Sequence, residues 1–339
     1  MKKTIILVAL LFAAIFAAGC GEKEAEGDKG VKDLKVALVL TGPINDGGWS
    51  QSAYEGLIGI AAKYDAQTAY LENVQAAQYN MSIRNYAKDG YNVIIANGAQ
   101  FLDAVKEVSA EYPDTVFLVS STDVTAKFGN GTNVSGVIGD GIEQGFLMGV
   151  TAAYLAQEQG SKKVAAVAGV EIPAFKKTLE GYNLGVAYVD KSIQVVQAFT
   201  GSTDDVNKLK EQALTFIQQG NTVVLSHANA ATRGGYEATM GNAGTLSIGA
   251  NASKQMFANY ANNLAASGNI KLSQAFIDTV GYVYDGTFAG EDYIFGVDDG
   301  VVSLAMSTTE PTIKKVQDKV QKVIDEMKSG KLDVYDLIK

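Results

Sequence analysis

Short apolar runs alternate along the chain with stretches in which apolar residues recur every three to four positions. Near-continuous apolar runs are typical of strands buried on both faces of a parallel sheet, and the recurring spacing is typical of helices. The predicted strands are 34–40, 68–74, 92–98, 115–121, 135–140, 163–169, 194–201, 222–228 and 245–251. The predicted helices cover about 48–64, 77–88, 101–110, 142–158, 174–189 and 205–219, another begins near 231, and a further strand and helix lie near 262–285.

This alternation predicts right-handed βαβ units and an α/β fold. The units form two series that join near 136–142, with no Pro- or Ser-rich linker between them. We therefore expect two doubly wound parallel-sheet lobes linked by short crossovers, a hinged clamp whose cleft lies at the carboxyl ends of the strands. The last stretch, 318–339, predicts an amphipathic helix and a tail. The apolar face of that helix contains Val320, Val323, Ile324 and Met327.

The N-terminus has the pattern of a secretory signal peptide. Lys2 and Lys3 precede an apolar segment, and small residues then lead to Cys20, the only cysteine of the chain. Small residues before a lone cysteine resemble a bacterial lipobox, in which the cysteine becomes the lipidated N-terminus. We expect 1–19 to be removed, Cys20 to carry the lipid, and the charged, Gly-rich stretch 20–33 to be a flexible tether. A retained transmembrane anchor is the alternative, although the apolar segment is short for a span.

Composition and missing motifs exclude several functional classes. A net charge of −9 with scattered Lys and Arg argues against binding to nucleic acid, and 47% hydrophobic residues predict a folded chain. One cysteine and one histidine leave no intrachain disulfide, no thiolate or His-rich metal site and no Ser-His-Asp triad away from His227. The sequence lacks a phosphate-binding P-loop, a G-x-S-x-G elbow and a dinucleotide-binding glycine pattern after the first strand. We therefore expect a protein that is not an enzyme and that carries no cofactor or metal.

The side chains that follow the predicted strands form the candidate binding site. They combine aromatic rings, amides and one imidazole with few charges, which suits a planar, neutral ligand that is held between rings and hydrogen-bonded at its edges. Other roles stay open: the aromatic residues could belong to the core, His227 could cap the next helix, and Asp46 could form a turn or a helix N-cap. The candidate ligand-binding residues are Asn45, Asp46, Trp49, Asn97, Phe101, Phe175, His227, Asn229, Asn251 and Lys254.

The loop after the first strand resembles a family signature. GPINDGGWSQSAYEGL, residues 42–57, contains the pattern D-x-[SG]-[FW]-[NST]-Q-x-x-x-x-G of the basic membrane lipoprotein (BMP) family. The resemblance continues in order from about 34 to 310, through EYPDTVFLVSS, GDGIEQGFLMGVTAAYLA, VAGVEIPAFKKTLEGYNLGV, TGSTDDVNKLKEQALTFIQQG and YDGTFAGEDYIFGVDDGVVSLA. Members resembling this chain are substrate-binding lipoproteins of ABC importers with a type I periplasmic-binding-protein fold.

The resemblance implies roles for individual residues. An aromatic side chain at the position of Trp49 stacks on a purine ring, and the carboxylate at the position of Asp46 binds the edge of that ring. A branch of the family has a histidine in the segment corresponding to 226–232, so His227 and Asn229 are implied as further contacts. Asn251 stands where nucleoside receptors have an aspartate that holds the ribose hydroxyls, and the family's lysine after the next strand has no clear counterpart. Nucleoside and nucleobase therefore both remain candidate ligands.

These observations predict an extracytoplasmic, lipid-anchored, monomeric receptor that delivers a purine-like solute to an ABC permease and its ATPase. The alternatives are a receptor for another small polar or aromatic solute, a ligand sensor not coupled to transport, and, least favoured, a nucleoside hydrolase. The expected first lobe comprises 34–139 plus about 252–287. The expected second lobe comprises 140–251 plus about 288–339.

Overall fold

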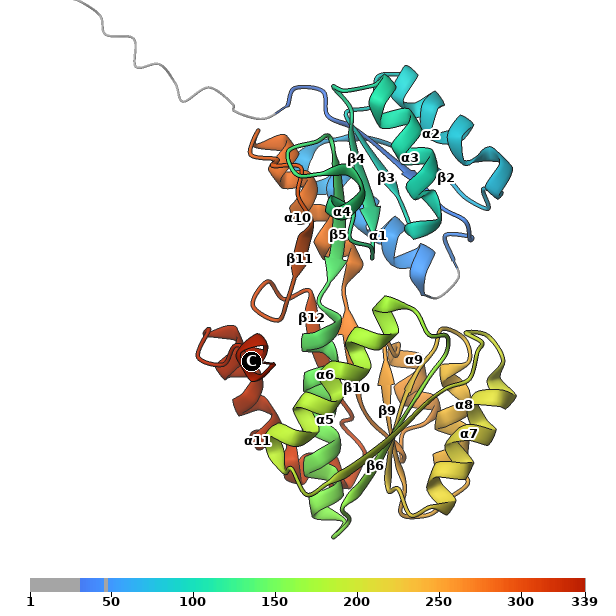
Figure 1. The fold of residues 1–339 in the computed structure, drawn as a ribbon, viewed down its shortest axis with the longest axis vertical. Coiled ribbons are helices and arrows are strands. Elements are labelled where there is room, and N and C mark those ends of the chain that lie inside the picture. Colours follow the sequence, from blue (N-terminus) through green and yellow to red (C-terminus); the bar gives the residue numbers. More distant parts are fainter. Residues whose placement is uncertain (1–30, 46–47, 339) are drawn as a thin grey trace, which may run out of the picture.

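The structure is a computed structural model that describes residues 31–45 and 48–338. The expected signal peptide, Cys20 and Asp46 therefore lie outside the described residues. Figure 1 shows two α/β lobes, one above the other, joined by several chain segments between them. The predicted two-lobed architecture is confirmed.

The first lobe is built on a six-stranded parallel sheet with the order β11-β5-β4-β3-β1-β2. From β1, the strands β3, β4 and β5 follow one another toward one edge of the sheet, where β11, which comes late in the sequence, pairs with β5. The strand β2 lies on the other side of β1 and forms the opposite edge. These strands are β1 (Lys35–Val39), β2 (Gln67–Leu71), β3 (Val93–Ala96), β4 (Val116–Ser120), β5 (Val134–Gly139) and β11 (Tyr293–Phe295).

The second lobe repeats this plan, with the order β12-β10-β9-β8-β6-β7. Its last strand, β12, runs antiparallel to β10, whereas the other pairs are parallel, so the expectation of a purely parallel sheet is wrong at this edge. The strands are β6 (Lys163–Ala168), β7 (Gln194–Phe199), β8 (Val223–His227), β9 (Leu246–Ala250), β10 (Leu264–Ile270) and β12 (Val302–Met306).

Helices connect the strands and cover both faces of each sheet. The helices of the first lobe are α1 (Trp49–Tyr64), α2 (Tyr79–Lys88), α3 (Leu102–Glu111), α4 (Thr125–Phe128) and α10 (Leu272–Tyr284). Those of the second lobe are α5 (Gly141–Glu158), α6 (Pro173–Val189), α7 (Val206–Gln218), α8 (Thr232–Met240), α9 (Lys254–Asn259) and α11 (Pro311–Lys328). Three short 3₁₀ turns complete the set: η1 (Ala76–Gln78), η2 (Ala99–Phe101) and η3 (Val334–Leu337).

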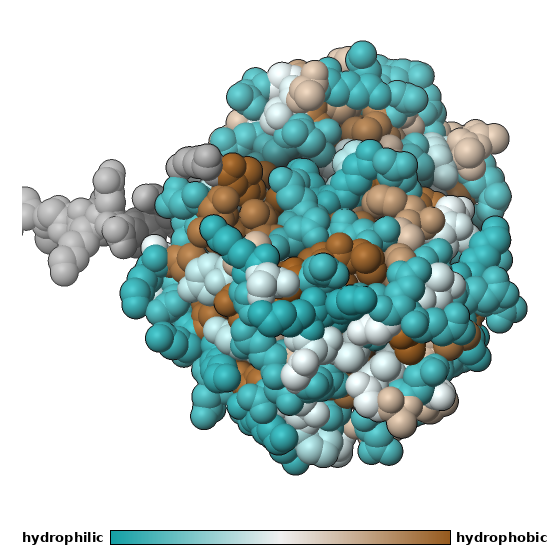
Figure 2. Space-filling model, turned by 60° about the horizontal axis from the view of Figure 1, so that its bottom comes forward, coloured by the Kyte–Doolittle hydropathy of each residue, from teal (hydrophilic) through white to brown (hydrophobic). Residues whose placement is uncertain are grey.

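The apolar strands are buried because successive side chains point to opposite faces of a sheet that is covered on both sides. In β6, Val164 and Ala166 pack with α5, α6 and α11, while Ala165 and Val167 pack with α7 and α8. The first sheet is divided in the same way, with α1 and α10 on one face and α2 and α3 on the other. On the face seen in Figure 2, hydrophobic side chains form separate patches among hydrophilic ones. Burial of both faces of each sheet explains why the strands could be predicted from apolar runs alone.

The two long helices α5 and α6 touch through their backbones. A Cβ atom on Gly145 would lie 2.0 Å from the carbonyl oxygen of Thr178, and one on Gly181 would lie 2.0 Å from the carbonyl oxygen of Ile142. Glycine at these positions therefore permits an approach that any side chain would prevent.

Three chain segments cross between the lobes: 139–141, 270–272 and 295–302. They are hydrogen-bonded to one another, since the Asp140 N–H donates to the Phe295 carbonyl at 2.9 Å and the Lys271 N–H donates to the Val301 carbonyl at 2.9 Å. These segments form the hinge region.

The crossings correct two of the expected lobe boundaries. Segment 252–270 belongs to the second lobe, because β10 pairs with β9 and β12; only from Leu272 does the chain lie in the first lobe, where α10 packs against α1. Segment 288–295 belongs to the first lobe, because β11 pairs with β5. An apolar strand pattern shows that a strand is buried but not which of two sheets it joins, so the sequence left this choice open.

Candidate functional site

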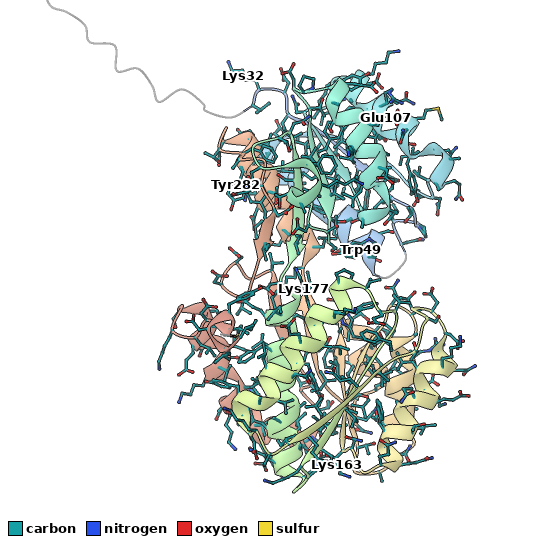
Figure 3. All side chains as sticks on the ribbon, in the orientation of Figure 1. Lys32, Trp49, Glu107, Lys163, Lys177 and Tyr282 are labelled. Carbon is teal, nitrogen blue, oxygen red and sulfur yellow. The ribbon has the colours of Figure 1, made fainter. Side chains whose placement is uncertain are left out.

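Trp49 lies at the end of the first lobe that faces the second lobe (Figure 3). It is the first residue of α1, directly after the loop that leaves β1, and its half-buried side chain packs against the core of the first lobe together with Ile44 and Tyr54. The ring is thus supported by the lobe on one side without being enclosed by it. In the same loop Asn45 is exposed, and the Ile44 N–H donates to the Glu72 carboxylate at 2.7 Å.

Asn97 follows β3 and is nearly inaccessible, with 1% of its surface exposed. Its side-chain oxygen accepts a hydrogen bond from the Ser120 hydroxyl at 2.8 Å, so the two strand ends are tied together. The left-handed Gly98, with φ 128°, then turns the chain into η2.

Phe101 is not available to a ligand in this structure, and its assignment as a contact is wrong here. The side chain is fully buried in the cluster between the first sheet, α2 and α3, with its ring centroid 4.3 Å from that of Tyr79. The reason is the 3₁₀ turn η2, which precedes α3 and ends at Phe101. A place in the core was the alternative that the sequence analysis left open for this aromatic residue.

In the second lobe, Phe175 and His227 come together although they lie far apart in the sequence. Phe175 is in the first turn of α6, His227 is the last residue of β8, and their ring centroids are 4.6 Å apart in an edge-to-face arrangement at 73°. Both residues are half-buried. An edge-to-face pair of this kind holds both rings in fixed orientations.

The imidazole of His227 is neutral at physiological pH, because burial lowers its pKa to about 4. Its Nδ1 atom is buried and has no hydrogen-bond partner among the described residues. A neutral imidazole offers one donor and one acceptor, so it can bind the edge of a heterocycle.

Three polar residues follow the next strands of this lobe. Asn229 and Lys254 are exposed, the latter as the first residue of α9. Asn251 directly follows β9 with a left-handed backbone, φ 57°, and its side-chain oxygen accepts a hydrogen bond from the Ile270 N–H at 2.8 Å. Asn251 therefore joins the ends of β9 and β10.

Lys177 was missed by the sequence reasoning. Figure 3 shows it at the end of the second lobe that faces the first, near the hinge region. It lies beside the start of α5, since a Cβ on Gly141 would be 3.4 Å from the Lys177 Cβ. The clue in the sequence was its place in the first turns of a helix that follows a strand end.

Glu143, in the first turn of α5, is a second functional candidate that sequence reasoning missed. Its carboxylate accepts a hydrogen bond from the Val297 N–H at 2.6 Å, which links α5 to the third crossing segment. Burial, together with the nearby carboxylates of Asp140, Asp298 and Asp333, raises the pKa of Glu143 to about 7. The hinge region thus contains a carboxyl group that titrates near neutrality.

Among the described residues, two of the surface hollows lie on the second lobe. The larger, about 460 Å³, runs between α6 and the edge strand β7, and the other, about 340 Å³, lies along α11. Neither is lined by Trp49 or His227. Across the described ranges 31–45 and 48–338, no cluster of His, Cys, Asp or Glu is arranged to hold a metal ion, and no helix is long and apolar enough to span a membrane.

Two doubly wound lobes with a hydrogen-bonded hinge, and with aromatic and polar side chains at the facing strand ends, define the class of two-lobed solute-binding proteins. The chain belongs to the family described as "ABC transporter substrate-binding protein PnrA-like", whose model matches residues 33–336. The resemblance of the loop sequence to this family is confirmed.

Individual proteins agree with this assignment. The transcriptional activator protein med of Bacillus subtilis is 27% identical over 200 residues, which are 59% of this chain and 58% of med. A purine-binding protein of Brucella abortus is 25% identical over 316 residues, 89% of this chain and 83% of that protein. An ABC transporter solute-binding protein of Conexibacter woesei shares the fold, with a TM-score of 0.71 at 23% identity, covering 88% of this chain and 98% of the other. Membership of this family implies a small-molecule ligand and transporter subunits as partners.

Proposed function

We propose that the protein is the receptor of an ABC importer and binds a purine-type solute, nucleoside or nucleobase, by closing its two lobes around it. In this proposal it is anchored outside the cytoplasmic membrane by a lipid on Cys20, is monomeric and catalyses no reaction. The observation that carries the proposal is the half-buried ring of Trp49 on the end of the first lobe that faces the second.

The proposed contacts divide between the lobes. Trp49 stacks on the heterocycle from the first lobe, with Asn45, Asp46 and Asn97 beside it. From the second lobe, His227 offers a neutral imidazole whose Nδ1 has no partner among the described residues, held edge-on by Phe175. Asn229, Asn251 and Lys254 add polar groups at the neighbouring strand ends. Closure shifts the population toward a form that the permease recognises.

Two observations support a purine as the ligand. The aromatic, amide and imidazole side chains at the facing strand ends suit a flat ligand that has hydrogen-bond donors and acceptors along its edge. The Brucella abortus relative, which spans most of this chain, is named a purine-binding protein.

The test uses Trp49, the only tryptophan of the chain, as a built-in reporter. Fluorescence titration and calorimetry of the mature protein with adenosine, guanosine, inosine, adenine and guanine should give saturable binding for at least one of them. Measured by calorimetry, binding should be abolished in Trp49→Leu and retained in Met240→Leu, a change at an exposed residue at the end of α8. If none of the five compounds binds, the purine assignment is refuted.

A ligand sensor uncoupled from transport is the second candidate, because the relative med is named a transcriptional activator. The two functions differ in their genetic context. ATPase and permease genes beside this gene support import, whereas a histidine kinase gene in their place supports sensing. Release of free base from a nucleoside by the pure protein would contradict both.

A further inference from the structure

The end of the chain folds back toward the hinge region. After α11, residues 330–338 form a C-terminal strap that contains η3, and Figure 1 shows it beside the upper part of the second lobe. The Leu332 N–H donates to the Glu326 carbonyl at 3.0 Å, and the side chain of Val334 is fully buried in the core formed with α5 and α11. The second lobe therefore fixes the position of the strap.

From this position Tyr335 reaches the first crossing segment, 139–141. Its hydroxyl donates to Asp140 Oδ2 at 2.7 Å. Burial, followed by this hydrogen bond, raises the pKa of Tyr335, so the phenol remains a donor at physiological pH. The Tyr335 N–H donates to the Asp333 carboxylate at 2.8 Å, which holds the turn that presents the ring. A hydrogen bond to a carboxylate is about twice as strong as one between neutral groups.

Asp140 is the residue at which the first crossing segment is bound to both lobes. Its N–H donates to the carbonyl of Phe295, in β11 of the first lobe, at 2.9 Å. Its Oδ1 atom accepts from the N–H groups of Ile142 at 2.8 Å and Glu143 at 3.1 Å, in the first turn of α5. A rotation of one lobe against the other therefore acts on the backbone at Asp140, while its side chain is held by the second lobe.

The other two crossing segments are coupled to this point. A Cβ on Gly139 would lie 2.3 Å from the Ile270 Cγ2 atom, so the first and second segments touch with no side chain between them. The third segment is held by Glu143, whose carboxylate accepts from the Val297 N–H at 2.6 Å. Because Asp140 caps the helical turn that carries Glu143, its position affects all three segments.

We propose that the C-terminal strap restrains the hinge: the hydrogen bond from Tyr335 to Asp140 keeps the first crossing segment in one conformation and so narrows the range of lobe orientations in the ligand-free protein. Orientations that displace Asp140 from the strap break this bond. Its removal therefore favours them by about tenfold or more, which is the equilibrium shift that corresponds to a hydrogen bond with a charged group. The role of the strap does not depend on which solute the protein binds.

Single-molecule fluorescence energy transfer between the lobes measures this range. Cys20 is the only cysteine of the chain, so in a Cys20→Ala background two dyes can be attached through Met81→Cys on α2 and Met240→Cys on α8, both exposed. In the ligand-free protein, Tyr335→Phe should raise the population outside the main interlobe distance about tenfold. The matched control Tyr188→Phe removes an exposed hydroxyl near the C-terminal end of α6 and should leave the distribution unchanged.

A double-mutant cycle with Asp140→Asn assigns the effect to the hydrogen bond itself. Asparagine caps a helix as well as aspartate does, so α5 keeps its start while the charged acceptor is lost. Asp140→Asn alone should broaden the distribution, and the double variant should broaden it no further than Tyr335→Phe. An unchanged distribution in folded Tyr335→Phe or Asp140→Asn, an equal broadening in Tyr188→Phe, or additive effects in the double variant would each overturn the restraint.

Discussion

The contact between α5 and α6 provides a sharp test of how the second lobe is held together. In Gly145→Ala the new Cβ would lie 2.0 Å from the Thr178 carbonyl oxygen and 2.8 Å from the Tyr182 nitrogen. Both neighbours are backbone atoms, so no rotamer change relieves the clash and the two helices have to move apart. Overpacking of this kind costs about 3 kcal/mol, and the better helix propensity of alanine returns about 1 kcal/mol. The expected net loss in unfolding free energy is about 2 kcal/mol.

Thermal unfolding followed by circular dichroism measures this loss. For a domain of this size, about 2 kcal/mol corresponds to a decrease in Tm of about 4–8 °C. Gly241→Ala is the matched control, because Gly241 ends α8 with φ −78° and a Cβ there would lie no closer than 3.6 Å to its neighbours. Equal melting temperatures for the two variants would refute the reasoning.

Three further predictions concern the hinge region, the site and the anchor. The pKa of Glu143, about 7, lies above that of an unfolded glutamate, so its contribution to stability is present at low pH and is lost as the pH rises through 7. Between pH 6 and 8 the Tm should therefore fall less in Glu143→Gln than in the wild type. Parallel curves of Tm against pH for the two proteins would contradict this. Because the pKa of His227 is about 4, purine affinity should change by less than about twofold between pH 5.5 and 8, while His227→Phe should weaken binding about tenfold; calorimetry across that range decides both. Cys20→Ala should lose radiolabelled palmitate and move from the membrane to the soluble extracytoplasmic fraction, and a variant that remains lipid-labelled would disprove the anchor.

The fold was largely readable from the sequence, and the exceptions have physical causes. Strands such as β6 were found because a sheet covered on both faces requires a continuous apolar run. The strand β11 was missed because it has only three residues, one of which, Ile294, is 53% exposed. The strand β12 was missed because four of its five residues are only half-buried at the edge of the sheet.

The site was readable only in part, because strand ends identify neighbours but not orientations. The place of Trp49 after the first strand was predicted, and the structure puts its ring at the facing end of the lobe. Phe101 also follows a strand, yet its 3₁₀ turn is local geometry that the residue pattern does not encode. The pairing of Phe175 with His227 depends on β6 lying beside β8, which is a property of the whole sheet.

The strand β11 joins the first sheet although it comes late in the sequence, and this affects when the first lobe can fold during synthesis. The first lobe cannot be completed until residue 295 has been synthesised, by which time every strand of the second lobe except β12 is already available. Contacts that span so much of the chain form slowly, because loop closure has to precede them. A polypeptide that delays its own compaction in this way suits export through a translocation channel that admits only extended chains.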